Sequence, residues 1–502
     1  MRKGKKKTLS TQEEIWREVE KEERKKRRIE NKYYYIIGAL FAIMFLSMIG
    51  YFSYFLVYGR EEIINNQYNT RTNDMAKNII RGDILANDET TVLAKSEEDI
   101  DGTVHRSYPF ANVFAHPIGY STKGMTGIEK QENSLLTKVD VGIWEQIVND
   151  ITGKKVKGNN VVTTLDVGLQ QFCYNALGDH IGAVVAMNPK TGEVLAMVSK
   201  PDFDPNPEAL DAAWESLTSE ENTNANLMNR ATQGHYPPGS TFKILTDIEY
   251  IRENPDTWQN FSYTCNGTFY YNDLVMNCHE GHAHGTVNPR TALSLSCNGA
   301  FATMGLSLNR SNFTELCEAF GFNRQLDTEI SHKTSSLTFS DESSDWDIIQ
   351  TSIGQGKTMV SPLHMAMITS AIANDGKMVS PYLVKKVVAE DGTVVKEATI
   401  KESDPLITEE EREKIVDFMT AVVTEGSGYR AGSKYAQVAG KTGSAQYGTE
   451  GKMHAWFTGF APVEDPQIAI TIILEGGGSG GDVAAPIMGQ IYDYYFSTHP
   501  VE

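Results

Sequence analysis

The chain has 502 residues, 40% of them apolar, so it can bury a large core and is long enough for two or three folding units. Its formal net charge of −19 is unevenly spread, because residues 1–32 hold 13 Lys/Arg against 7 Asp/Glu and the rest is acidic. An acidic body with one basic end is the wrong charge pattern for nucleic-acid binding, so we expect no nucleic-acid partner.

An uncharged segment of 25 residues follows the basic end. Residues 33–57 (YYYIIGALFAIMFLSMIGYFSYFLV) would extend about 37 Å as a helix, enough to cross a hydrocarbon layer of ~30 Å. A cleaved signal peptide is the alternative, but its apolar core would be shorter and would end at a small-residue cleavage site. The cluster RKKRR at residues 24–28 places the N-terminus in the cytoplasm. We therefore predict a basic cytoplasmic tail over 1–32 and a single-pass helix in the cell membrane over 33–58, with the rest of the chain outside the cytoplasm.

The exported part divides by composition into two regions. Residues 59–158 are polar and interrupted by Gly and Pro, which predicts a small β-rich or irregular module that sets a distance from the membrane. Within 159–502, apolar β-branched runs flank the turn NPKTG and predict a hairpin over 181–200. The spacing of apolar residues after that hairpin is mostly helical, as in 290–306 and 409–423.

Strands return near the C-terminal end, where apolar runs are separated by Gly, Asp or Pro at 438–447, 455–461 and 467–474. A final helix is expected over 482–496. Strands at both ends with helices between them predict an α/β (α+β) fold. We expect one antiparallel sheet flanked by helices, with an inserted helical subdomain.

The segment HYPPGSTFKILT, residues 235–246, carries the strongest chemical signal. Two prolines and a glycine precede Ser240 and an apolar run follows, so Ser240 is predicted at a helix N-terminus, with Lys243 one turn later on the same face. A serine alcohol becomes a nucleophile when a base is held within about 2.6–3.2 Å of it. A lysine serves as that base when burial or another cation lowers its pKa. The alternative is an N-cap serine followed by a surface lysine.

Two later segments offer groups that complete such a site. LSLSCNGAF contains Ser296 and Asn298, a hydroxyl that could relay a proton and an amide that could hold a peptide carbonyl. AGKTGSAQYG contains Lys441, a second cation that would help to keep Lys243 neutral and would attract a carboxylate. Gly443 in that segment would leave room for a ligand backbone along the strand.

Lys-Thr-Gly occurs twice in the chain, and the two copies differ in context. The copy at Lys190 is the tip of the predicted hairpin, where its lysine would point to solvent. The copy at Lys441 opens a predicted strand and follows the other two motifs in sequence. We therefore expect the second copy to belong to the site.

In this order, Ser-x-x-Lys, Ser-x-Asn and Lys-Thr-Gly resemble the signature of penicillin-binding proteins and serine β-lactamases. The resemblance extends to GAVVAMNPKTGEVLAMVSKPDFDPN, GHAHGTVNPRTALSLSCNGAFA, IGQGKTMVSPLHMA and HAWFTGFAP, which together cover most of 160–500. RGDIL near Arg81 and TGIE near Glu129 are similar to the linker region of the class B members. The resemblance identifies 159–502 as a penicillin-binding transpeptidase domain of class B.

The resemblance assigns roles to the first two motifs. It makes Ser240 the acylated nucleophile and Lys243 its base, and it gives Ser296 and Asn298 the proton relay and the substrate peptide. Cys297 departs from the β-lactamase pattern, which has Asp between these two residues. Because Ser296 and Asn298, the outer residues of the motif, carry the assigned roles, Cys297 changes little in the implied function.

The third motif is implied to bind substrate. Lys441 and Thr442 would bind the terminal carboxylate, alongside Gly443. The backbone N–H groups of Ser240 and Ser444 would form the oxyanion hole. No cofactor is implied.

The implied reaction is cross-linking of peptidoglycan stem peptides through an acyl-enzyme on Ser240, which β-lactams would trap. A D,D-carboxypeptidase shares every motif and remains an alternative, as does a non-catalytic scaffold of a wall-synthesis complex. A β-lactamase is disfavoured, because the Glu-x-x-x-Asn setting of its deacylating glutamate is absent between Asn298 and Lys441. The implied partner is a multi-span glycan polymerase.

Five cysteines leave one unpaired. Cys265 and Cys278 flank a predicted hairpin outside the cytoplasm, so a disulfide is the preferred interpretation. His279, His282 and His284 follow closely and permit a zinc interpretation, but the spacing matches no standard finger. We therefore expect no metal site, and we expect the other cysteines to be small buried residues.

Overall fold

The computed structural model describes residues 11–55, 79–100, 102–138, 155–340, 342–448 and 451–501. The start of the predicted tail (1–10), the end of the predicted transmembrane helix (56–58) and parts of the predicted linker module (59–78, 139–154) lie outside the described residues. The chain forms two compact units, Met1–Asn69 and Thr70–Glu502.

The first unit contains one long helix, α1 (Thr11–Tyr54). This helix includes part of the predicted basic tail and most of the apolar segment. By length and composition it can cross a membrane. Its apolar side chains, such as those of Leu40 and Phe45, are exposed on the surface of the helix. An apolar helix of this kind near the N-terminus fits the expected single-pass anchor.

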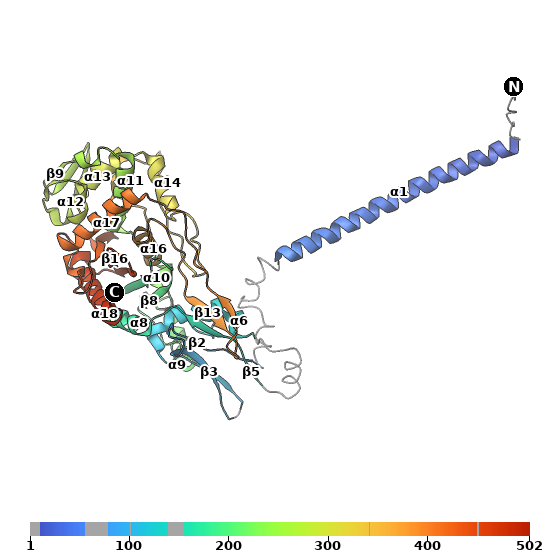
Figure 1. The fold of residues 1–502 in the computed structure, drawn as a ribbon, viewed down its shortest axis with the longest axis horizontal. Coiled ribbons are helices and arrows are strands. Elements are labelled where there is room, and N and C mark those ends of the chain that lie inside the picture. Colours follow the sequence, from blue (N-terminus) through green and yellow to red (C-terminus); the bar gives the residue numbers. More distant parts are fainter. Residues whose placement is uncertain are drawn as a thin grey trace, which may run out of the picture. The chain divides into compact units, whose positions relative to one another are not determined.

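A five-stranded antiparallel sheet forms the centre of the second unit (Figure 1). Its strands come from the two predicted groups, and β17 pairs with β7, so that Ile472 lies opposite Val184. The prediction of one sheet built from both ends of the domain is confirmed. In spatial order the strands are β15 (Ala439–Tyr447), β16 (Lys452–Ala461), β17 (Ile468–Leu474), β7 (Gly182–Met187) and β8 (Val194–Lys200).

Helices cover both faces of this sheet (Figure 1). On one face, α8 (Val167–Ala176) and α18 (Ala485–Thr498) enclose a core that includes Ile470 and Ile472 of β17. On the other face lies α16 (Pro362–Ala373), every residue of which is buried. Because successive strand residues point to opposite faces, β17 has apolar residues throughout, as expected for a strand that is buried on both sides.

The inserted helical subdomain differs from the prediction at one point. The spacing over 290–306 predicts a continuous helix, but the structure has two helices with a break at residues 295–297. Ser296 in that break has φ 59°, in the left-handed region that non-glycine residues rarely adopt. The subdomain comprises α11 (Lys243–Glu253), α12 (Pro289–Ser294), α13 (Asn298–Ser307), α14 (Arg310–Ala319), α15 (Asp345–Ser352) and α17 (Glu409–Thr424).

A second, six-stranded sheet lies in the region of the predicted linker module. Two of its strands come from residues 384–397, far along the chain; the first pairs with a strand that follows the module, and the second pairs with the first. The expected boundary at residue 158 does not foresee this long-range pairing. In order the strands are β14 (Val394–Glu397), β13 (Val384–Val388), β6 (Asn160–Thr163), β2 (Ile84–Leu85), β3 (Val92–Glu98) and β4 (Val104–Ser107). Shorter elements include α4 (Ala115–Ile118), α5 (Gly127–Gln131), α6 (Asn133–Leu136), α9 (Pro207–Thr218), α10 (Arg230–Gln233), β1 (Ile79–Ile80) and β5 (Val156–Lys157).

A buried carboxylate ties the linker module together. Glu129 is fully buried and accepts hydrogen bonds from Arg81 Nε, from Arg106 Nε at 2.8 Å and from the Tyr108 hydroxyl at 3.1 Å. Burial alone would raise the pKa of Glu129, but the charges of Arg106 and Arg81 outweigh it and hold that pKa below its usual value. The segments RGDIL and TGIE, which are distant in sequence, meet through this ion pair.

We predict that Glu129→Gln lowers the free energy of unfolding by about 3–5 kcal/mol, because it leaves two buried guanidinium groups without their counter-charge. Since the folded pKa of Glu129 is lowered, its contribution is complete above the usual glutamate pKa and is lost as the pH falls through the folded value. Urea unfolding at neutral pH and at pH ~3 checks both statements.

Glu97→Gln is the matched control, because Glu97 pairs with Lys95 on the surface and should contribute about 0–1 kcal/mol. Equal stability of the two variants at neutral pH would contradict the account of Glu129.

Candidate active site

Ser240 lies in a 3₁₀ turn, η3 (Gly239–Phe242), that runs directly into α11. The predicted position at a helix N-terminus is therefore found. Gly239 has φ 55°, and a Cβ there would lie 2.9 Å from Ala445 Cβ on β15. The turn thus packs directly against the edge strand of the sheet, which needs a glycine at this position for conformation and for space.

Lys243, the first residue of α11, is fully buried and reaches the Ser-x-Asn motif. Its Nζ donates to the Ser296 carbonyl oxygen at 2.8 Å, to Ser296 Oγ at 3.2 Å and to Asn298 Oδ1 at 2.7 Å. Within the described part of the chain the Ser240 hydroxyl has no hydrogen-bond partner. Contacts of a catalytic base often tighten only when substrate binds, so the amine can still turn to the alcohol.

Lys441, on β15, approaches the same hydroxyl from the sheet. Its Nζ donates to Ser296 Oγ at 3.0 Å and to the Thr442 carbonyl oxygen at 2.9 Å. The Ser296 hydroxyl therefore lies between Lys243 and Lys441, which are 198 positions apart in the sequence. With its two lone pairs directed at the lysines, that hydroxyl can direct its own proton toward a substrate.

The asparagine of the motif is held from both sides. Asn298 Nδ2 donates to the carbonyl oxygen of Asn277 at 3.0 Å, while Oδ1 accepts from Lys243. Asn277 ends a short strand of the inserted subdomain. The orientation of the amide is therefore set by a segment that carries no motif.

Burial dominates the electrostatics of the site. It lowers the pKa of Lys243 to about 8, although Cys297, Cys278 and Asp247 act in the opposite direction. It also lowers the pKa of Lys441 well below its usual value, with a further lowering by the charge of Lys243. A lysine of this kind is neutral often enough at physiological pH to accept a proton.

Asp247 is a site residue that the sequence reasoning missed. It lies one turn after Lys243 on α11 and is fully buried, and neither carboxylate oxygen has a hydrogen-bond partner among the described residues. Burial raises the pKa of Asp247 well above the usual aspartate value, because it outweighs the charges of Lys243 and Lys441, which lower that pKa. Its spacing of four from Lys243 was the only sequence signal.

The Lys-Thr-Gly strand shows one difference from expectation. A Cβ at Gly443 would lie 3.0 Å from Trp456 Cβ and 3.1 Å from the carbonyl oxygen of Pro238. Protein atoms therefore occupy the space in which we expected a ligand backbone, and the glycine lets β15 approach the Ser240 turn. Thr442 Oγ1 lies 2.7 Å from Ser427 Oγ.

Ser444 follows on the same strand, and its Oγ accepts a hydrogen bond from the backbone N–H of Gly480 at 3.0 Å. The structure places the other copy of Lys-Thr-Gly elsewhere. Lys190 lies in the turn between β7 and β8, where its half-exposed side chain pairs with Asp465. Lys190 therefore lies outside the cluster of Lys243, Ser296 and Lys441.

Comparisons with known proteins agree with this arrangement. Residues 182–493 match the penicillin binding protein transpeptidase domain, and residues 81–161 match the penicillin binding protein A dimerisation domain. A curated relative is the peptidoglycan D,D-transpeptidase PbpA of Mycolicibacterium smegmatis, 31% identical over 412 residues, which are 76% of this chain and 82% of that protein. Another is the peptidoglycan D,D-transpeptidase MrdA of Acinetobacter baumannii, 29% identical over 455 residues, covering 80% of this chain and 67% of that protein.

Solved structures give the same result. A ceftriaxone acyl-enzyme complex of penicillin-binding protein A from M. tuberculosis has a TM-score of 0.76 and 28% identity, over 84% of this chain and 99% of that chain. A D,D-transpeptidase domain from Eggerthella lenta has a TM-score of 0.75 and 28% identity, over 84% and 99%. The chain belongs to the penicillin-binding protein transpeptidases, and within them to class B.

Proposed function

We propose that this chain is a serine D,D-transpeptidase that cross-links peptidoglycan stem peptides and is acylated by β-lactams at Ser240. The observation that carries the proposal is the Ser296 hydroxyl, which lies 3.2 Å from Lys243 Nζ and 3.0 Å from Lys441 Nζ, next to the Ser240 turn. The relatives named D,D-transpeptidases and the acyl-enzyme structures of related proteins support it.

In the first half-reaction, neutral Lys243 accepts the Ser240 proton while Oγ attacks the carbonyl carbon of a D-Ala-D-Ala bond. Backbone N–H groups of Ser240 and Ser444 stabilise the oxyanion. As the C–N bond breaks, the proton passes through Ser296 to the leaving D-Ala amine. An amine from a neighbouring stem then attacks the ester and frees Ser240, whereas attack by water would give a carboxypeptidase.

Substrate recognition is assigned to the remaining residues. Lys441 and Thr442 bind the terminal carboxylate, beside Gly443, because the charge of Lys441 and the hydroxyl of Thr442 suit an anion. The Asn298 amide binds the substrate peptide. A penicillin presents a carboxylate and a strained amide in a comparable arrangement and therefore acylates the same serine.

We also propose the setting of the reaction. The cluster RKKRR supports a cytoplasmic N-terminus, which puts residues 159–502 on the outer side of the membrane and leaves 59–158 as the linker module. A multi-span glycan polymerase is the proposed partner and would contact the anchor and the linker module. A non-catalytic scaffold of the same complex is the competing function.

We predict that Ser240→Ala abolishes D-Ala release, cross-linking and covalent penicillin binding by the full chain in detergent, because no other group replaces the nucleophile. A stem-peptide assay followed by chromatography separates cross-linked from hydrolysed product and so distinguishes transpeptidase from carboxypeptidase. If the chain were a non-catalytic scaffold, the wild-type chain would form neither product above the level seen with Ser240→Ala. That result would contradict the proposal.

We predict that Lys441→Ala slows acylation by penicillin about 10²-fold or more, because it removes a preorganised hydrogen-bond donor to Ser296 and the group proposed to bind the drug carboxylate. Lys190→Ala is the matched control in the other Lys-Thr-Gly copy and should acylate at the wild-type rate. Stopped-flow measurement with a fluorescent penicillin checks both variants, and equal slowing of the two would refute the assignment.

We predict that the acylation rate rises with pH with an apparent pKa of about 8, because the reaction needs neutral Lys243. Asp247→Asn removes a group that in its ionised form favours the ammonium form of Lys243, so the profile should move to lower pH. The rate is measured from pH 6 to pH ~10. A wild-type profile centred at the usual lysine pKa, or a variant profile that does not move, would contradict this account of the site.

A further inference from the structure

A loop that carries no motif lies directly beside the Lys-Thr-Gly strand. This loop, residues 425–431, follows α17. Its Ser427 Oγ lies 2.7 Å from Thr442 Oγ1, and the backbone N–H of Ser427 donates to the carbonyl oxygen of Ser294 at 3.0 Å. A Cβ at Gly426 would lie 2.3 Å from that same oxygen, so the loop packs closely against the end of α12. The loop therefore contacts the strand of the third motif and the helix that leads into the second.

A second loop, residues 475–482, follows β17 and reaches the same strand. The backbone N–H of Gly480 donates to Ser444 Oγ at 3.0 Å, and a Cβ at Gly481 would lie 2.7 Å from the carbonyl oxygen of Ser427. The two loops therefore contact each other as well as the strand. We call these two loops together the two-loop rim of the site.

An arginine at the exposed end of the two-loop rim is oriented by both loops. Arg430 Nη1 donates to Asp482 Oδ1 at 2.8 Å, and Arg430 Nε donates to the Tyr429 hydroxyl at 2.9 Å. Nη2 has no hydrogen-bond partner within the part of the chain that the structure describes. The side chain of Arg430 is 42% exposed and that of Asp482 is 66% exposed. A guanidinium that two partners hold in place, with N–H groups still free, is suited to bind a carboxylate from solvent.

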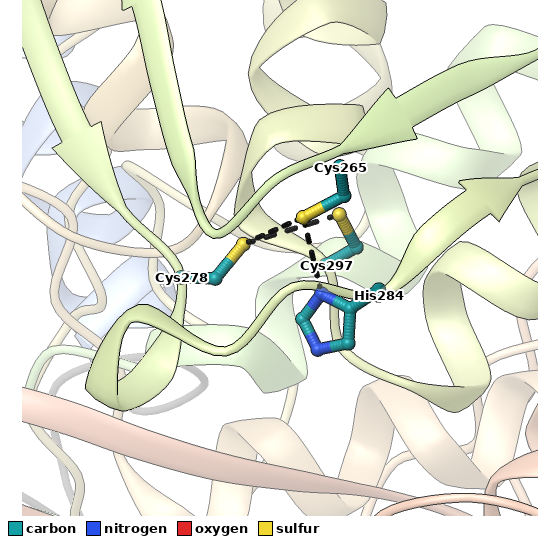
Figure 2. Close-up of side chains that lie close together, drawn as sticks. All are labelled: Cys265, Cys278, His284 and Cys297. Atoms are coloured by element: carbon teal, nitrogen blue, oxygen red, sulfur yellow. Dashed lines mark hydrogen bonds between the residues drawn. The ribbon is translucent and has the colours of Figure 1, made fainter.

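The middle residue of the Ser-x-Asn motif faces the interior of the inserted subdomain instead. Cys297 is fully buried, and its side chain points toward those of Cys265, Cys278 and His284 (Figure 2). All five cysteines are free thiols, so the predicted Cys265–Cys278 disulfide is not formed. Because buried side chains fill this wall of the site, a second peptide would approach from the two-loop rim rather than from here.

We propose that the two-loop rim binds the acceptor stem peptide and that Arg430 pairs with a carboxylate of that peptide, an inference that rests on the proposed function. The attacking amine takes the position of the D-Ala amine that has left, because Ser296 exchanges a proton with both amines. The amine nitrogen bonds to the acyl carbon, and the bond from that carbon to Ser240 Oγ breaks. The proton that the amine loses returns to Ser240 Oγ through Ser296 and Lys243.

The position of the amine places the rest of the acceptor over the two-loop rim. The amine lies where D-Ala was bound, beside Thr442, and the peptide attached to it extends away from the ester. Ser427 touches Thr442, and Arg430 is three residues further along the loop, at most roughly 10 Å away. An amine-bearing side chain and one further residue span a comparable length. A stem peptide that ends one residue after the amine-bearing residue can therefore bring its terminal carboxylate to the guanidinium.

The test measures how the acyl-enzyme divides between transfer to an acceptor and hydrolysis. The full chain in detergent receives a stem pentapeptide ending in D-Ala-D-Ala as donor and a tetrapeptide stem with a free side-chain amine as acceptor. We expect Arg430→Ala to lower the ratio of cross-linked to hydrolysed product about tenfold at subsaturating acceptor, because a hydrogen bond between charged groups is lost. Chromatography with mass-spectrometric detection measures both products.

An acceptor with its terminal carboxylate converted to an amide separates recognition from a structural effect. With this acceptor the wild-type chain should also show a ratio about tenfold lower, and Arg430→Ala should cause no further loss. Lys377→Ala is the matched control and should keep the wild-type ratio, because Lys377 forms an exposed ion pair of the same length, 2.8 Å, with Glu402. Equal loss with both acceptors in Arg430→Ala, or no loss with either, would overturn the inference.

The same assay distinguishes failure of this inference from failure of the proposed function. A wild-type chain that neither penicillin nor the donor acylates would overturn the proposed function and, with it, the acceptor site. A wild-type chain that is acylated and only hydrolyses the donor would also overturn both. A wild-type chain that cross-links the two acceptors equally well would overturn the role of the two-loop rim alone.

Discussion

The structure depends on one partly buried hydroxyl, that of Ser296, which two fully buried lysines share. Ser296 Oγ accepts from Lys243 and from Lys441, and each of these residues comes from a different part of the fold: α11, the break between α12 and α13, and the edge strand β15. Removing an ammonium group from water costs several kcal/mol, and that cost lowers the pKa of both lysines. The same burial that destabilises the charged forms lowers the pKa of Lys243 to about 8, which the proposed role of this residue as a base requires. The fold therefore has to hold three distant segments together at an energetic cost.

Several contacts outside the motifs hold these segments in place. Gly239 lets the nucleophile turn pack against β15, and Trp456 Nε1 donates to the carbonyl oxygen of Pro237 at 3.1 Å, just before that turn. On the opposite side, the carbonyl oxygen of Asn277 in the inserted subdomain accepts from the Asn298 amide. The catalytic groups are thus supported from the sheet and from the inserted subdomain.

The sequence predicted the local parts of this account and missed the parts that depend on pairing across long distances. Apolar runs and turn residues were sufficient for the sheet from both chain ends and for placing Ser240 at a helix start. They did not reveal that β13 and β14 join the sheet of the linker module, because the residue pattern of a strand does not show which other strand it pairs with. The helical spacing of apolar residues also continues across Ser296 and predicts one helix there. The helix is broken instead, because the surroundings of Ser296 impose a left-handed conformation. Asp247 was missed because it looks, in sequence, like an ordinary neighbour of a motif.

The most direct test of the central claim is a crystal structure of the full catalytic region of the chain after reaction with benzylpenicillin. The account predicts an ester between Ser240 Oγ and the opened lactam carbonyl, with that carbonyl oxygen at the backbone N–H groups of Ser240 and Ser444. It also predicts that the Ser296 hydroxyl remains between Lys243 and Lys441, with the drug carboxylate at Lys441 and Thr442. An adduct on another residue, or a bound drug that does not approach this cluster, would contradict it.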